Sequence, residues 1–400
     1  MLVKSCQSTE PNTLKDVFHR LELLSQRYPP ESESVRVDSK LIGRVLAEDI
    51  VAERNIPEVR TSREHGFATM VDYSGEKRRI VGSSTALSPY NAALLPGECV
   101  RIAIGGVVPE GADTVVPADD VALTSQEEDA DETVEFVFEL GKGENIREPG
   151  SDAKTGDVLL TDGFRMDSVA VGILREVNVS QVEVYRKPSV CVMSIGNRYE
   201  DKKQMEFSRP VLQSLFHSQG FTAIDAGNAE EELHDIEKKF RRAAKFSCVI
   251  VTTGATGTVR EVTKKLGLIM DINTVPSNPG NFSFAHGKID RKPVLLCMFP
   301  ADVSSSWIGA NLFVSPMLRA MEGRSLKNAP KFRANLTESV RKSSKVQFLC
   351  GRVEHLNGSL VVKPIHCKTL MGANSIIEVS ANSEGGIVEV HLIESPNFQI

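Results

Sequence analysis

The sequence predicts a multidomain α/β and β protein, and three patterns in its 400 residues support that class. Short strand-like runs separated by glycine and proline fill residues 36–184, which favours a largely β region. After Pro188, apolar strand-like runs alternate with helical periodicity, as expected for a parallel sheet covered by helices on both faces. From Asn328 onward the pattern returns to strands.

An amphipathic helix is expected first, over residues 13–28. Thr13 can cap its first turn, where Asp16 also favours the helix dipole. The apolar residues that recur at three- and four-residue steps are Leu14, Val17, Phe18, Leu21 and Leu24.

Further elements follow in three groups. In the β region, strands are expected at 99–104, 113–116 and 134–138. In the alternating region we expect buried strands at 189–195, 222–225, 248–253 and 294–299, with helices near 209–219, 229–245, 259–268 and 303–321. The tail is expected to form strands at 347–353, 359–363 and 386–393. Parallel α/β sheets bind ligands where the carboxyl ends of strands meet the following loops, so a site is expected there.

Composition and charge restrict the classes of function. A net charge of −6 gives no general basic surface for phosphates, so nucleic-acid binding is not expected. No run of eighteen apolar residues occurs and the first residues lack the apolar core of a secretory signal, so we expect a cytoplasmic protein that does not bind membranes. The seven cysteines are scattered and never spaced Cys-x-x-Cys, which favours reduced thiols over disulfides or zinc.

The segment 55–68 carries the most specific pattern of the chain, and reads Asn-Ile-Pro-Glu-Val-Arg-Thr-Ser-Arg-Glu-His-Gly-Phe-Ala. It resembles the signature loop of the molybdopterin molybdenumtransferases and the gephyrin E domain. The residues that match the family's frame are Pro57, Ser62, Gly66 and Ala68.

Two further segments support the resemblance, and two positions depart from it. Residues 101–116 and 145–152 resemble other motifs of the family, so the match extends over long and ordered spans. In the signature loop, however, two family aspartates fall on Arg60 and His65. A carboxylate has thus become a cation at one position and an imidazole at the other.

The family's layout implies four domains over nearly the whole chain. Residues 13–45 with 148–185 would form a first, mixed, dimer-forming domain, and 46–147 an inserted β domain. Residues 186–322 would form an α/β domain resembling the molybdopterin-binding domain, and 323–400 a C-terminal β domain. A homodimer is therefore expected.

Five motifs that the resemblance places around one pocket have changed their side chains. The changed positions are Arg60, His65, Asn197, Arg198, Val262, Asn278, Asn281 and Asp302. The expected remnants of the pocket are Ser62, Gly66, Arg147, Asp152, Ser194, Gly196, Thr253, Gly254 and Pro300. Because carboxylates that could hold a cation and lysines that could hold phosphate are lost, we expect no catalytic residue and no metal ligand.

Three of these assignments keep an alternative. His65 could be a general base or a metal ligand, although a lone histidine is more often an ordinary polar loop residue. Arg147 and Asp152 could be pocket remnants or a structural ion pair. Thr253 and Gly254 could present amides to an anion or simply form a strand-to-helix turn.

The family also suggests a peptide-binding groove between the first and last domains. Its aromatic anchors fall on Phe18 and Phe348, although the periodicity of the first helix alone would place Phe18 in the core.

The preferred hypothesis is a catalytically inactive scaffold that binds protein partners in a regulatory pathway and needs no cofactor. Within the family, the chain resembles a divergent nematode paralogue assigned to developmental timing. The alternative is a weakened or repurposed molybdopterin molybdenumtransferase of molybdenum cofactor biosynthesis, which would use molybdopterin and a divalent cation.

Overall fold

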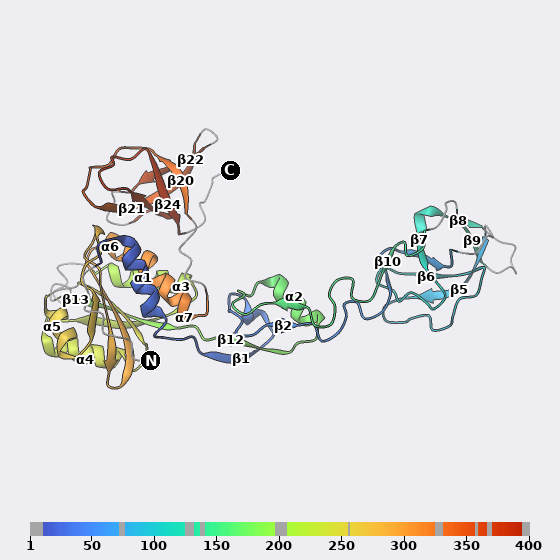
Figure 1. Cartoon of the computed structure of the whole chain (residues 1–400), viewed down its shortest axis with the longest axis horizontal. Coiled ribbons are helices and arrows are strands. Elements are labelled where there is room, and N and C mark those ends of the chain that lie inside the picture. Colours follow the sequence, from blue (N-terminus) through green and yellow to red (C-terminus); the bar gives the residue numbers. More distant parts are fainter. Residues whose placement is uncertain are drawn as a thin grey trace. The chain divides into compact units, whose positions relative to one another are not determined.

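The computed structural model describes residues 11–71, 77–124, 132–136, 141–196, 206–254, 257–324, 331–356, 359–365 and 370–393 (Figure 1). The chain forms two compact units. The first contains Met1–Ala47, Gly163–Asp167 and Gln181–Ile400, and the second contains Glu48–Asp162 and Ser168–Ser180. The four domains expected from the sequence stay a prediction.

The first unit is built on a six-stranded sheet, which confirms the expected α/β class. Its order is β14 (Thr222–Ala229), β13 (Ser189–Ile195), β15 (Val249–Thr253), β19 (Lys292–Phe299), β18 (Ser283–Ile289) and β16 (Ile269–Ile272). The first four strands are parallel, and β18 pairs antiparallel with both β19 and β16. Neither β18 nor β16 had been predicted. His286 and Gly287 interrupt the apolar pattern of β18, which is why the sequence did not reveal it.

Alternate residues of the parallel strands enter two separate cores, because successive side chains of a strand point to opposite faces. One face packs against α4 (Leu233–Ala243) and α5 (Gly257–Lys265). The other packs against α1 (Leu14–Ser25), α3 (Ser208–Ser218), α6 (Val303–Gly309), the π-helical segment η4 (Ala310–Val314) and α7 (Ser315–Met321). Both faces of the sheet are therefore covered, as the near-continuous apolar strands require.

The first helix begins where its capping residue predicts. Thr13 Oγ1 accepts a hydrogen bond from the amide of Asp16 at 3.1 Å, and the Asp16 carboxylate accepts one from the Thr13 amide at 3.0 Å. This reciprocal capping box satisfies two backbone donors that no helical carbonyl can reach. Val17, Leu21 and Leu24 then point into the core.

Two further sheets complete the first unit. β1 (Ser32–Arg36) pairs with β12 (Gln181–Tyr185), close to the short η1 (Ser39–Leu41). The tail forms a six-stranded sheet in the order β17 (Ser277–Asn278), β21 (Val346–Leu356), β22 (Ser359–Pro364), β20 (Lys331–Leu336), β24 (Ile387–Leu392) and β23 (Ser375–Val379). Because β17 precedes β18 in the chain, this pairing ties the tail sheet to the α/β region.

The second unit is mostly β, as expected. Its main sheet has the order β7 (Thr114–Pro117), β4 (Gly66–Thr69), β6 (Glu98–Ile102), β5 (Lys77–Ser84), β9 (Thr133–Phe136) and β8 (Val121–Thr124), with η2 (Ala118–Asp120) between β7 and β8. Two small ladders join β3 (Thr61–Ser62) to β10 (Ile146–Arg147) and β2 (Ile50–Val51) to β11 (Val158–Leu160), and α2 spans Ser168–Glu176. None of the helices described in either unit is long and apolar enough to cross a membrane.

Candidate functional site

The carboxyl ends of β13, β15 and β19 meet at one edge of the α/β sheet. Ser194 in β13 lies in register with Thr253 in β15, which in turn lies in register with Phe299 in β19. The predicted site residues that the sheet brings to this edge are Ser194, Gly196, Thr253, Gly254, Pro300 and Asp302. This is the edge at which open α/β sheets hold their ligands.

Gly254 fixes the backbone at the end of β15. Its φ of +88° lies in the region that L side chains rarely adopt, and a Cβ there would be 2.3 Å from the carbonyl oxygen of Ile195. The loops after β13 and β15 are therefore in close contact, and only glycine fits between them. Helix α5 begins at Gly257, so the free amides of its first turn belong to this edge and can receive an anion.

Asn228 also belongs to this edge, and the sequence analysis missed it. Its Nδ2 donates to the carbonyl oxygen of Gly196 at 3.1 Å, and its Oδ1 accepts from Ser194 Oγ at 3.2 Å. Lys239 Nζ donates to the Asn228 carbonyl oxygen. The predicted strand ended at Asp225, but β14 continues to Ala229. This longer strand brings Asn228 beside Ser194.

Asp302 occupies the edge as a helix cap. Its Oδ1 accepts a hydrogen bond from the amide of Ser305 at 2.8 Å, which satisfies a free donor at the start of α6. Ser306 Oγ donates to the Pro300 carbonyl oxygen at 2.7 Å, and Ser208 Oγ donates to that of Ala301 at 2.7 Å. These contacts hold the turn after β19 against α3 and α6.

Val262 is one of the changed motif positions, and its assignment to the edge of the pocket stays a prediction. It lies on α5 with no exposed surface and packs in the same core as Val259 and Met298. The apolar residue therefore serves the contact between helix and sheet.

The remaining changed positions of the first unit are less informative. Asn278 lies in β17, paired with Gln347 of β21, and its side chain is exposed. Asn281 is also exposed. Asn197 and Arg198 lie outside the described residues.

The signature loop lies in the second unit, where Arg60 lines a cavity of about 760 Å³. Arg60 Nη2 donates to the carbonyl oxygens of Ala112 at 2.6 Å and Pro109 at 3.3 Å. The guanidinium of Arg60 is thus hydrogen-bonded to the turn after β6, and residues of that turn also line the cavity. Other residues around it carry both signs of charge, namely Glu58, Glu110, Asp113 and Lys142.

Ser62, His65 and Gly66 have structural surroundings that explain the loop's form. Ser62 Oγ donates to the Glu64 carbonyl oxygen at 2.6 Å and accepts from the Glu64 amide at 3.2 Å, which closes a local turn. His65 is exposed, and its carbonyl oxygen accepts from Ala118 N at 3.0 Å. At Gly66 a Cβ would lie 1.8 Å from the Val116 carbonyl oxygen, so β4 and β7 can approach only because glycine stands there.

Arg147 and Asp152 form an ion pair in the second unit. Their side chains are 33% and 42% exposed, so the pair is partly open to water and stabilises only modestly. The Asp152 amide also donates to Ile56 O at 2.9 Å. Both residues thus have structural partners beside the start of the signature loop.

The described residues suit an anionic or hydrogen-bonding substrate better than a divalent cation. Among them, no group of three or more His, Cys, Asp or Glu side chains is placed to hold a metal ion. The strand edge supplies hydroxyl, amide and backbone groups. The carboxylate of Asp302 at this edge is engaged as a helix cap.

The two expected anchors of a peptide groove are packed in the first unit. Phe348 is only 1% exposed, and its ring centroid lies 6.3 Å from that of His391. A partner could not reach this ring without opening the core, and its assignment as a contact residue stays a prediction. Phe18 is partly buried, and its ring centroid lies 5.9 Å from that of Phe313. This contact agrees with a place on the buried face of α1.

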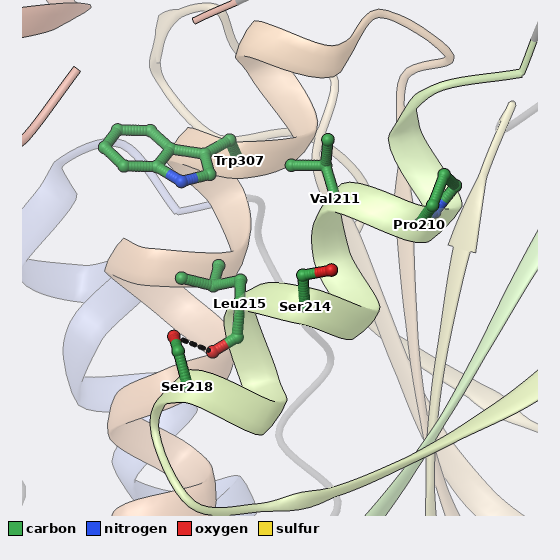
Figure 2. Close-up of a pocket in the computed structure, with 6 residues that line it drawn as sticks. All are labelled: Pro210, Val211, Ser214, Leu215, Ser218 and Trp307. Atoms are coloured by element: carbon green, nitrogen blue, oxygen red, sulfur yellow. Dashed lines mark hydrogen bonds between the residues drawn. The ribbon is translucent and has the colours of Figure 1, made fainter. Parts of the chain in front are cut away.

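A second cavity lies between α3 and α6 in the first unit (Figure 2). Its volume is about 430 Å³, and no predicted site residue lines it. Its lining is mostly apolar, and consists of Pro210, Val211, Ser214, Leu215, Ser218 and Trp307.

A covered α/β sheet with a glycine-lined strand edge, an inserted β unit and a β tail place the chain in the class of multidomain α/β and β proteins. Residues 14–177 match the family described as MoeA N-terminal region (domain I and II). The chain is a divergent member of the family that contains MoeA and the gephyrin E domain.

Relatives match most of the chain. The molybdopterin molybdenumtransferase of Haemophilus influenzae is 26% identical over 81% of this chain and 82% of its own length. That of Bacillus subtilis is 27% identical over 88% and 85%. A molybdopterin biosynthesis MoeA protein from Pyrococcus horikoshii has the same fold, with a TM-score of 0.78 and 23% identity over 94% of this chain and 99% of that one.

These relatives overturn the expectation of an inactive regulatory scaffold, because they are molybdopterin molybdenumtransferases and nothing among them points to a scaffold. The error has a physical reason. The hypothesis rested on replaced side chains, whereas the strand edge also depends on backbone geometry, as the close contact of Gly254 with Ile195 shows. The narrower resemblance to a nematode paralogue stays a prediction.

Proposed function

We propose that this protein acts in molybdenum cofactor biosynthesis as a molybdopterin molybdenumtransferase of reduced or altered activity. The observation that carries the proposal is the match to enzymes of that name over 81 to 99% of the chain. The strand edge agrees with it, because open α/β sheets bind their ligands at this place. Molybdopterin would be the substrate and molybdate the source of the transferred metal.

The residues of the strand edge would bind and orient the substrate. Gly254 lets the loop after β15 lie against Ile195, so that the first amides of α5 can face an anionic group. Asn228 holds the backbone of Gly196 on the other side through its amide nitrogen. Asp302 fixes the start of α6. In this proposal the substrate is positioned by backbone and side-chain amide groups, which are suitable donors for a bound oxyanion.

Reduced activity is proposed because charged groups of the family motifs are replaced. Where the family has aspartates, this chain has Arg60 and His65, and Arg60 is bonded to backbone carbonyl oxygens. Removing one group that stabilises a transition state typically slows catalysis by about a hundredfold to a thousandfold. Such losses do not add simply when the groups act together.

Turnover by the purified full chain tests the proposal. Metal-free adenylylated molybdopterin, molybdate and magnesium would be mixed with the protein, and molybdenum retained with the pterin would be measured by mass spectrometry. The Bacillus subtilis relative is the positive control. We expect molybdate-dependent product at a rate about a hundredfold to a thousandfold below the relative's. Product no greater than in a mixture without protein would overturn the proposal.

Location and assembly remain part of the proposal. A cytoplasmic protein is consistent with the free state of the described cysteines, which are Cys99, Cys191, Cys248, Cys297 and Cys350. A homodimer is retained from the family resemblance, and sedimentation of the purified chain would test it.

A further inference from the structure

A group of cations surrounds the end of α7, at the edge of the sheet opposite the candidate site. Lys187 precedes the first residue of β13, so it lies at the amino ends of the parallel strands. Arg319 lies in the last turn of α7, and the chain then reverses at Gly323, which has a φ of +79°. The Arg324 amide donates to the Arg319 carbonyl oxygen at 2.9 Å, which brings Arg324 back against the helix.

Two other segments are packed against this turn. A Cβ on Gly323 would lie 2.0 Å from the ring of Tyr185, so the end of β12 touches the turn directly. A Cβ on Gly163 would lie 3.6 Å from the Gly323 carbonyl oxygen, which places the loop carrying Arg165 there as well. Three stretches that are distant in sequence therefore bring four cations to one place.

Glu322 is the carboxylate at the centre of this group, and it is only 4% exposed. Burial raises its pKa, and the charges of Lys187, Arg324 and Arg165 oppose that rise without overcoming it. Burial lowers the pKa of Arg319, and the charges of Arg324 and Arg165 lower it further. The cations thus repel one another more than the single carboxylate compensates.

Within the described part of the chain, Glu322 is the carboxylate that acts on the buried guanidinium groups, and it is outnumbered by them. Among the described residues, no side-chain hydrogen bond or ion pair involves Arg165, Arg319 or Arg324. Nearby Arg44 differs, because its Nη2 contacts Glu33 at 2.6 Å and donates to the Tyr185 carbonyl oxygen at 3.0 Å. Arg319 and Arg324 are partly buried, and partly buried cations without a hydrogen-bonded anion are costly.

We propose that Arg165, Arg319 and Arg324 form a binding site for a tetrahedral dianion of the phosphate type. Each guanidinium presents a planar fork of donors that matches two oxygens of such an anion. A phosphate dianion carries more charge and more acceptor oxygens than a carboxylate, so it can receive several forks at once. The site stands apart from the strand edge and does not depend on the transferase proposal.

Titration with inorganic phosphate at constant ionic strength tests the site, with heat of binding as the readout. The full chain should bind phosphate, and Arg319→Gln should weaken binding by about tenfold or more, because charge-assisted hydrogen bonds are lost. Arg241→Gln is the matched control. Arg241 on α4 is paired with Glu237 of the same helix and with Asp290 of the turn between β18 and β19. Its replacement should therefore leave the phosphate affinity unchanged.

Two further arms keep the result decisive. If Arg319→Gln fails to fold, Arg165→Gln replaces it, because Arg165 is exposed on a loop. Acetate at the same ionic strength should bind at least about tenfold more weakly than phosphate. The proposal is wrong if phosphate does not bind at millimolar concentration, if the arginine variants bind as the wild type does, or if acetate binds equally well.

Discussion

Glu378 should contribute strongly to the stability of the tail sheet, and the change Glu378→Gln would measure this. Its Oε2 accepts from His391 Nε2 at 2.8 Å and from Lys331 Nζ at 2.9 Å, and its side chain is only 23% exposed. The hydrogen bond from His391, opposed by burial and assisted by Lys331, lowers the pKa of Glu378 from 4.5 to about 2.

The size of the effect follows from this shift. One pKa unit corresponds to about 1.4 kcal/mol, so the ionised carboxylate stabilises the folded sheet by about 3 kcal/mol at neutral pH. Because the folded-state pKa is depressed, this stability is fully present above pH 4.5 and is lost as the pH falls through about 2. At pH 3 it should be reduced to about half.

Hydrogen exchange followed by mass spectrometry is the appropriate assay, since a chain of several domains does not unfold in one step. After correction for intrinsic rates, amides of β23 and β24 in Glu378→Gln should exchange about a hundredfold faster at pH 7, and the ratio should shrink at pH 3. Glu389→Gln is the control, because Glu389 is 45% exposed and lies 3.4 Å from the same lysine. Glu389→Gln should lower the stability of the tail sheet by less than about 1 kcal/mol. Equal protection in wild type and Glu378→Gln at pH 7 would refute the reasoning.

Three other substitutions test the packing described above. Gly66→Ala should separate β4 from β7, because its Cβ would meet Val116 O, and exchange in both strands should rise while that of the first unit is unchanged. Gly254→Ala should lower transferase turnover by about tenfold or more through strain against Ile195, and unaltered kinetics would speak against the close contact of the two loops. Phe348→Ala should destabilise the first unit by about 3 to 5 kcal/mol, measured as faster hydrogen exchange in β21, whereas a surface anchor would cost less than about 0.5 kcal/mol.

Local periodicity was enough to predict much of the fold. The capping pattern of Thr13 and Asp16 predicted the first helix, and near-continuous apolar runs predicted the parallel strands. Elements with a broken pattern were missed. β18 contains His286, whose Nδ1 lies 2.5 Å from Asp271 Oδ2, and such a pairing between strands is invisible in a linear pattern.

The candidate site was predicted less well. A sequence pattern indicates which side chains are present, whereas the strand edge is shaped largely by the path of the backbone. Val262 was assigned by alignment to a family motif, although its spacing from Val259 on one helix already indicated a buried stripe. Asn228 could not be assigned, since the bulge that brings it to Ser194 arises from the pairing of β13 with β14. The role of Gly254 appears only once its contact with Ile195 is known.

The central claim is that the carboxyl edge of the α/β sheet binds molybdopterin. Equilibrium binding of molybdopterin to the purified chain tests it most directly, with Asn228→Ala compared to Asn311→Ala. Both side-chain amides make two hydrogen bonds, but Asn311 bonds to Trp307 and Gln219 within the helical layer. The account predicts submillimolar binding that Asn228→Ala weakens by about tenfold and Asn311→Ala leaves unchanged. Binding that is absent, or equally affected by both changes, would contradict it.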